Sequence, residues 1–565
     1  MVGGVVARGL AVACAIEGGF YCWQAKQRRH LSQRLPLYDD TERSPSGRPF
    51  TYERRRREVR RLLEQEFGVD NESVGAPLGR TPERGKRWIS GWFFDTPYHE
   101  IDHAMIRTFL AWAWFNHVHA SELSEVASAE VEADITAIEA AAGQSFRAPP
   151  SPPPSQGEQP QPVEPQLSQD RRRSKGLTSM RPNVDNTAPF HAHHPLLFYF
   201  LTQFLIGTVR QRQVLSSLGF ERATIQVDGA DSQGEGAKRV SFSYWHRPAR
   251  SKEDGGGDKA SNREVETDLA PIVLYHGIGL GWGHSYPPLL RDLVTAADEA
   301  PGGRPIFAVE LPHVSLTVPT DYGPSPADAV TATCTMLRRH GVGPGQATRR
   351  ADFLGHSYGS VAVTHVLKQC PECVRSAALV DPVCVGAHRA TLCRTFLYDP
   401  LDSRPSSSAP MTVRQRPQLY ERFMGWFLHS DPRLVGVLMR NFLWFENVLW
   451  LDDEEIDAGA LGGATTEGGA EDAGDGQIAL FVAEGDRYLD GRTIYEDAQR
   501  AIERRRRQRG SEGDNKAGGT ARRTLRAVLW GNGQDHGEWL GREEQRREVI
   551  EVVTRRSSRA SWTRG

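Results

Sequence analysis

The stretch that decides the fold is residues 349–381, RRADFLGHSYGSVAVTHVLKQCPECVRSAALVD. A short apolar run, 351–354, leads into Gly355-His356-Ser357-Tyr358-Gly359, and an apolar helical pattern follows at once. This is a G-x-S-x-G motif between a strand and a helix, where the tight turn requires glycine on both sides of the serine. Ser357 is therefore predicted at the end of a strand and the start of a helix, whose free N–H groups favour developing negative charge.

The pattern around this motif is regular. Short continuous apolar runs alternate with helical segments, and the runs lie at 271–275, 305–311, 351–354, 376–380, 477–482 and 525–530. Buried strands alternating with helices predict a doubly wound, mostly parallel sheet of the α/β class, with helices on both faces. Two earlier segments with alternating polarity, 223–227 and 239–245, predict a hairpin.

Composition shifts along the 565 residues predict several units. A proline-rich stretch separates helical N-terminal sequence from the sheet pattern, and an aromatic segment with an acidic, glycine-rich tail interrupts that pattern after its fourth strand. The predicted units are an apolar anchor or targeting segment at 1–38, a helical extension at 39–147, a linker at 148–194, the core in two parts at 195–383 and 477–565, and a helical cap at 384–476.

The N-terminus has the features of a membrane anchor or a targeting segment. Residues 2–23 are mostly apolar, with Arg8 and Glu17 as the charges, and a basic cluster follows from Lys26 to Arg34. The length suits one membrane span, and the near absence of acidic residues also fits an organelle transit peptide. An ordinary helix is the third interpretation.

Composition excludes some functions. The chain has 69 basic and 71 acidic residues, so no overall positive field favours nucleic-acid binding. Its seven cysteines show no paired spacing pattern of a disulfide framework. Cys370-Pro-Glu-Cys373 is a single CxxC without a second pair, which favours two helix-end cysteines over a zinc or redox site.

A serine nucleophile needs a base, an acid that orients this base, and donors for the oxyanion. His536 follows the last apolar run and is the predicted base. Asp486 closes the fifth run and is the predicted acid, with Asp490 and Asp381 as alternatives.

The predicted oxyanion donors lie in Leu274-Tyr275-His276-Gly277-Ile278-Gly279, where a strand runs into a glycine-containing turn. Gly277 lets the backbone approach the substrate, and the backbone N–H groups of Ile278 and Tyr358 are the expected donors.

These motifs resemble the α/β-hydrolase superfamily over residues 220–553, in the elbow, the His-Gly turn and the order serine, acid, histidine. The resemblance implies that Ser357, Asp486 and His536 form a triad that cleaves esters through an acyl-enzyme, without a metal or an organic cofactor. It also implies that the segment after the fourth run is the variable cap. The aromatic character of this cap favours a small-molecule or lipid ester with an apolar acyl group.

Two other hypotheses come from different classes. His99-Glu100-Ile101-Asp102-His103 matches H-E-x-x-H, with Glu122 further on, and resembles the spacing of gluzincin metallopeptidases. A hydrolase fold without catalysis, acting as a membrane scaffold or partner binder, is the third class. Gly283-His284-Ser285-Tyr286 mimics the elbow, but Pro287 follows it, so Ser285 is predicted to cap a helix.

Overall fold

The computed structural model describes residues 2–31, 51–68, 82–116, 119–148, 178–182, 184–185, 193–228, 239–249, 270–300, 302–315, 324–343, 350–398, 428–429, 431–442, 444–457, 476–511 and 523–554. Most of the predicted linker and a large part of the predicted cap lie outside these residues. Within the linker, however, Met180 is buried and its N–H donates to the Trp92 carbonyl at 2.9 Å, so this part of the linker packs against the N-terminal helices.

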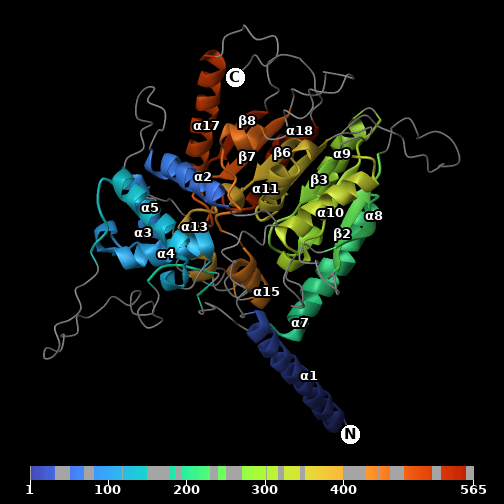
Figure 1. The fold of residues 1–565 in the computed structure, drawn as a ribbon. Helices are drawn as coiled ribbons and strands as arrows, with labels where there is room; N and C mark the ends of the chain where they lie inside the picture. The colour runs from blue at the N-terminus through green and yellow to red at the C-terminus, as the bar shows by residue number, and fades with distance from the viewer. Residues whose placement is uncertain are drawn as a thin grey trace.

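The centre of the molecule is one eight-stranded sheet in the order β1-β2-β4-β3-β5-β6-β7-β8 (Figure 1). The first two strands form an antiparallel hairpin, β2 is antiparallel to β4, and all other neighbours are parallel. The predicted hairpin and all of the predicted apolar strands are confirmed. The strands are β1 (Glu221–Asp228), β2 (Arg239–Arg247), β3 (Ile272–Tyr275), β4 (Ile306–Val309), β5 (Ala351–His356), β6 (Val374–Val380), β7 (Gln477–Ala483) and β8 (Thr524–Trp530).

Helices cover both faces of this sheet, because successive residues of each buried strand point to opposite faces. Leu274 and Leu354 pack into the core shared with α9 (Pro287–Glu299) and α18 (Glu543–Thr554). Val273 and Phe353 pack into the opposite core, which includes α10 (Pro326–Arg339), α11 (Gly359–Gln369) and α17 (Gly491–Ser511). The predicted doubly wound α/β architecture is therefore confirmed.

The N-terminal extension is a helical layer beside the sheet (Figure 1, blue, at the left). Its helices are α2 (Tyr52–Leu62), α3 (Pro82–Trp92), α4 (His103–Phe115) and α5 (Glu125–Ala142). The indole N–H groups of Trp88 and Trp92 both donate to the His388 carbonyl, at 2.9 and 3.1 Å. The Phe445 ring packs against those of Trp92 and Trp112, so α4 is buried in protein.

Helix α1 (Val2–Leu31) projects away from the body in Figure 1. It contacts the segment that opens the core: Phe20 packs edge-on against Tyr199 at 5.7 Å, and Glu17 pairs with His193 at 2.6 Å. In the part of the chain that the structure describes, no helix combines the length and apolarity of a membrane span. The predicted membrane anchor thus gains no support from the helix that was expected to form it.

A continuous helical segment precedes the sheet, and its middle is a π-helix. It comprises α7 (Leu196–Tyr199), η4 (Phe200–Arg210) and α8 (Gln211–Ser217). At the other end of the core, α17 extends to Ser511. Arg505 on this helix pairs with Asp457 at 2.8 Å.

Two described parts of the predicted cap lie in different places. Residues of α15 (Pro432–Gly436) contact η7 (Pro312–Val314), the turn that follows β4 at the carboxyl edge of the sheet. Residues 444–457 instead pack between α11 and the N-terminal layer: Asn447 bonds to His365 at 2.7 Å, and Glu58 accepts a hydrogen bond from the Trp450 indole. The π-helix η10 (Val437–Asn441) follows α15 directly.

Candidate active site

The turn between β5 and α11 holds Ser357 in a left-handed conformation with φ of 54°. Such a φ is strained for a side chain other than glycine and is typical of functional turns. Both flanking glycines are sterically required, as the motif predicts. A Cβ on Gly355 would lie 2.7 Å from the Gly359 carbonyl oxygen, and a Cβ on Gly359 would collide with the Tyr275 carbonyl.

The structure brings the predicted nucleophile, base and acid together in one hydrogen-bonded row. Oγ of Ser357 lies 2.8 Å from Nε2 of His536, and Nδ1 of His536 lies 2.6 Å from Oδ2 of Asp486. The other oxygen of Asp486 accepts the backbone N–H groups of Tyr488 and Leu489, at 2.8 and 3.1 Å. The turn after β7 therefore fixes the carboxylate, and the carboxylate orients the imidazole.

The two alternative acids have other partners. Asp490 is exposed and caps α17, accepting the backbone N–H of Thr493 at 3.1 Å and its hydroxyl at 2.7 Å. Asp381 is buried with φ of 46°, and it accepts the backbone N–H groups of Ala483 and Gly537 at 3.2 and 2.8 Å. Asp381 thus holds the loop that carries His536 but makes no hydrogen bond to the His536 ring.

Charges around His536 favour its protonated form. Burial alone would lower the pKa of the ring, but the Asp486 carboxylate opposes this effect by ion pairing and hydrogen bonding, and the negative charge of Asp381 adds to it. The net result is a pKa of His536 above its ordinary value of 6.5. Proton transfer from Ser357 to His536 is correspondingly favourable.

The turn after β3 lies directly against the nucleophile. A Cβ on Gly277 would be 2.8 Å from Cβ of Ser357, so only glycine fits there. The Gly277 N–H donates to the Tyr286 hydroxyl at 2.7 Å, so Gly277 contributes to the predicted oxyanion turn by its close approach and not as a donor. The amides of Ile278 and Tyr358 have no acceptor among the described residues and remain the predicted donors.

Tyr286, His356 and His276 form a polar layer below this turn that sequence reasoning did not assign to the site. The Tyr286 hydroxyl lies 2.6 Å from Nδ1 of His356, whose Nε2 is 3.7 Å from Oδ2 of Asp381. Nδ1 of His276 donates to the Gly277 carbonyl at 2.8 Å, and its Nε2 accepts the Leu311 N–H at 3.0 Å. Burial lowers the pKa of His276 to about 4, which fits this neutral role.

One local sequence feature points to Tyr286, the elbow-like Gly283-His284-Ser285-Tyr286. Its serine, Ser285, is predicted to cap a helix. The predicted cap at Ser285 is wrong by one residue, since α9 begins at Pro287 after Tyr286 and no side chain caps it. The neighbouring cavity of about 660 Å³ includes Ser285 and Gly537 in its lining, but neither Ser357 nor His536 is part of that lining.

The structure contradicts the zinc-peptidase hypothesis. His99 lies in a 3-10 turn (Tyr98–Glu100) with its side chain 69% exposed, whereas His103 is the first residue of α4 and pairs with Glu132 at 3.0 Å. Glu122 lies in another short turn and binds the His119 amide. Among the described residues, none of these three side chains belongs to a group placed to share a metal ion.

Comparisons with known proteins give solved structures of similar architecture at low identity. No protein-family model and no curated protein sequence matches the chain. A bacterial membrane phospholipase A matches with 16% identity and a TM-score of 0.34, over 63% of this chain and 93% of its own. A Bacillus subtilis carboxylesterase matches with 15% identity and a TM-score of 0.33, over 62% and 97%. A Pyrococcus furiosus esterase matches with 12% identity and a TM-score of 0.33, over 60% and 92%.

Proposed function

The chain has the α/β-hydrolase fold, and on that premise we propose that it is a serine hydrolase that cleaves an ester through an acyl-enzyme. The observation that carries this proposal is the row from Ser357 through His536 to Asp486, with 2.8 and 2.6 Å between successive partners. The row lies at the carboxyl ends of parallel strands, where this fold exposes its nucleophile.

The proposed reaction has two half-reactions. Nε2 of His536 takes the Ser357 proton while Oγ attacks the ester carbonyl carbon, and the resulting oxyanion faces the amides of Ile278 and Tyr358. Collapse of this intermediate breaks the C–O bond, and His536 returns the proton to the leaving alcohol. A water molecule, deprotonated by His536, then attacks the acyl-enzyme and releases the carboxylic acid. Asp486 holds the ring tautomer throughout.

An apolar acyl group suits the aromatic surroundings of the nucleophile. The Tyr358 ring lies 5.6 Å from the His313 ring and 6.2 Å from Phe442, which belongs to the predicted cap. The Tyr488 ring stands edge-on to His536 at 5.2 Å. Such a lining favours small-molecule or lipid esters over highly charged substrates.

A fluorophosphonate probe tests the nucleophile. We expect covalent labelling of the wild type and of Ser285→Ala, the matched control in the elbow-like sequence, and no labelling of Ser357→Ala or His536→Ala. Labelling of Ser357→Ala at the wild-type level would refute the triad. Correct folding of all variants with no labelling and no ester hydrolysis by the wild type would favour the catalytically silent scaffold instead.

The acid is tested separately with ester hydrolysis. Asp486→Asn should lower kcat by about 10⁴-fold, because an amide in that position supports the wrong imidazole tautomer. Asp490→Asn should leave kcat unchanged, since asparagine caps a helix as well as aspartate does. If instead Asp490→Asn lost kcat and Asp486→Asn kept it, Asp490 would be the acid of the triad.

We also propose that the molecule associates with a membrane surface through exposed apolar side chains on α1, α7 and η4, as an alternative to an organelle-targeting role of the N-terminus. Large apolar side chains are exposed there, at Val12, Ile16, Leu197, Phe200, Leu201, Phe204 and Leu205. Exposed apolar patches of this kind mark interaction sites. Co-sedimentation with phosphatidylcholine vesicles should be lost in Phe200→Ser/Phe204→Ser but kept in the control Tyr52→Ser, and equal binding of both variants would contradict the proposal.

A further inference from the structure

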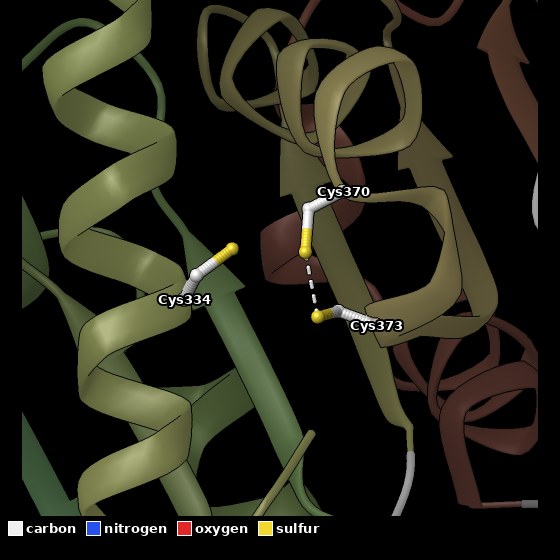
Figure 2. Close-up of side chains that lie close together, drawn as sticks. All are labelled: Cys334, Cys370 and Cys373. Atoms are coloured by element: carbon white, nitrogen blue, oxygen red, sulfur yellow. Dashed lines mark hydrogen bonds between the residues drawn. The ribbon is translucent and has the colours of Figure 1, made fainter. Parts of the chain in front are cut away.

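Three cysteine side chains converge at the amino-end edge of the sheet, opposite the edge that carries Ser357. Cys334 lies on α10, Cys370 follows the last residue of α11, and Cys373 ends the short turn η8 (Pro371–Cys373), directly before β6. Their sulfur atoms lie within 4.8 Å of one another. Figure 2 shows all three side chains pointing into the same space between α10 and the end of α11.

We propose that Cys334, Cys370 and Cys373 bind a Zn²⁺ ion as thiolates. Zinc binds cysteine sulfur at about 2.3 Å in a tetrahedral arrangement, which places the sulfur atoms about 3.8 Å apart. The sulfur atoms of Cys370 and Cys373 lie 2.6 Å apart, and no two of the three sulfur atoms are more than 4.8 Å apart. The Cys370 and Cys373 side chains must therefore rotate apart to reach the separation that zinc requires.

The surroundings of the cluster offer a fourth ligand and a route by which the ion can enter. A carboxylate oxygen of Glu372 lies 3.3 Å from Sγ of Cys370, and this side chain is exposed to solvent. Cys370 and Cys373 are buried, while Cys334 is half-buried. The ion is thus expected to enter from the Glu372 side and to be held by three sulfurs together with Glu372 or a water molecule.

The electrostatic surroundings suit a cation with anionic ligands. The carboxyl-terminal end of α11, which directly precedes Cys370, is the negative end of the helix dipole and favours positive charge there. The Arg523 guanidinium donates to the carbonyls of Pro371 and Val374, at 2.9 and 2.6 Å, and its charge offsets the excess negative charge of a zinc–thiolate complex.

Zinc uptake at this cluster releases protons. A cysteine thiol has an ordinary pKa of about 8.5 and is mainly protonated at pH 7. Each thiol loses its proton to solvent when its sulfur bonds to zinc, so affinity rises with pH.

A bound metal ion explains why a third sulfur atom, that of Cys334, lies beside the Cys370–Cys373 pair, whereas a redox-active pair does not. A disulfide between Cys370 and Cys373 would leave Cys334 without a role, and reactive CxxC thiols typically lie at a helix N-terminus that stabilises the thiolate. Here the pair follows a helix C-terminus, which has the opposite effect. The site ties α10 to the α11–β6 connection on the side remote from Ser357, so its expected role is structural.

Titration with Co²⁺, an optical stand-in for Zn²⁺, tests the proposal on the reduced, metal-stripped full chain. We expect thiolate-to-cobalt charge-transfer absorption that saturates at one equivalent and disappears when Zn²⁺ is added. Added Zn²⁺ should also raise the Tm of the wild type. The wild-type titration does not depend on the folding of any variant.

Variants then assign the ligands. Cys334→Ser and Cys373→Ser should lose the absorption, whereas Cys14→Ser/Cys22→Ser, which removes the exposed thiols of α1, should keep it. Absence of the band in the wild type, or its loss only in the α1 variant, would overturn the proposal. A Cys370–Cys373 disulfide would also overturn the proposal. It would show as a thiol count two below the seven cysteines in wild-type protein isolated without reductant, and this deficit would disappear when Cys373 is replaced.

Discussion

At the scale of single residues, two carboxylates act on His536 in different ways. Asp486 bonds to the ring itself, whereas Asp381 bonds to the backbone of Gly537 next to it and reaches the ring only through its charge. The position of an acid at a strand end therefore does not define its role. The distinction lies in which atom of the histidine loop each carboxylate reaches.

The pH dependence of ester hydrolysis follows from this arrangement. His536 must be neutral to accept the Ser357 proton, and its pKa is raised above 6.5, so kcat/KM should fall as pH drops, with a midpoint above 6.5. Asp381→Asn removes one charge that raises this pKa and should lower the midpoint by about one unit. Asp490→Asn is the control and should leave the pH–rate profile in place. A wild-type midpoint below 6.5 would contradict the prediction.

Tyr286 is predicted to position the oxyanion turn. Tyr286→Phe leaves the Gly277 N–H without its acceptor, so the neighbouring Ile278 donor loses its fixed orientation. We expect kcat to fall by about tenfold, equivalent to about 1.4 kcal/mol of transition-state stabilisation, with little change in KM.

Tyr244→Phe is the control, because this buried tyrosine also loses a hydroxyl hydrogen bond, to His340, but lies on β2 away from the site. Both variants should lose similar thermal stability, and only Tyr286→Phe should lose kcat. An equal loss of kcat in the two variants would show that the role of Tyr286 is purely structural.

At the scale of elements, the strand–turn–helix unit depends on close backbone contact between α11 and the turn after β3. Gly359→Ala places a methyl group against the Tyr275 carbonyl, which backbone movement alone can relieve. The free energy of unfolding should fall by about 1–3 kcal/mol, the usual cost of overpacking. Gly541→Ala, with open space around the added methyl group, should change it little. Urea denaturation measures both, and equal stability of the two variants would argue against this close packing.

At the scale of the whole molecule, the N-terminal layer is joined to the core by a buried ionic cluster. Glu66 accepts hydrogen bonds from Arg389 at 2.7 Å, from His388 at 2.9 Å and from Arg84 at 3.1 Å. Asp497 on α17 binds the same two arginines. Burial opposes ionisation of Glu66, but the Arg389 charge outweighs it and holds the pKa of Glu66 well below 4.5.

Glu66→Gln should therefore destabilise the fold by about 3–5 kcal/mol, since it leaves buried arginine charge without its partner. Because the pKa of Glu66 is depressed, its contribution is present above pH 4.5 and is lost as pH falls towards the folded-state pKa. The difference in unfolding free energy between wild type and variant should shrink accordingly in acid. Glu53→Gln, on the exposed side of α2, is the control, and a loss as large as that of Glu66→Gln would refute the role of the cluster.

The sequence alone determined the sheet, the elbow and the order of its partners. These features follow from short-range physics: apolar runs of strand length, glycines at a turn that tolerates no Cβ, and polar residues directly after strands. Ser357, His536 and Asp486 each carry such a local signal, so they could be selected before any contact was known.

Only the tertiary structure decided which groups meet across the chain. In the structure, the Gly277 N–H donates to Tyr286, and Asp381 accepts the backbone N–H of Gly537. His99 and His103 lie in different elements, and Cys334 lies beside the Cys370–Cys373 pair. The physical reason is the same in each case. Whether a donor, carboxylate or thiol is available depends on what packs within about 3 Å of it, and spacing along the chain does not encode that distance between remote segments.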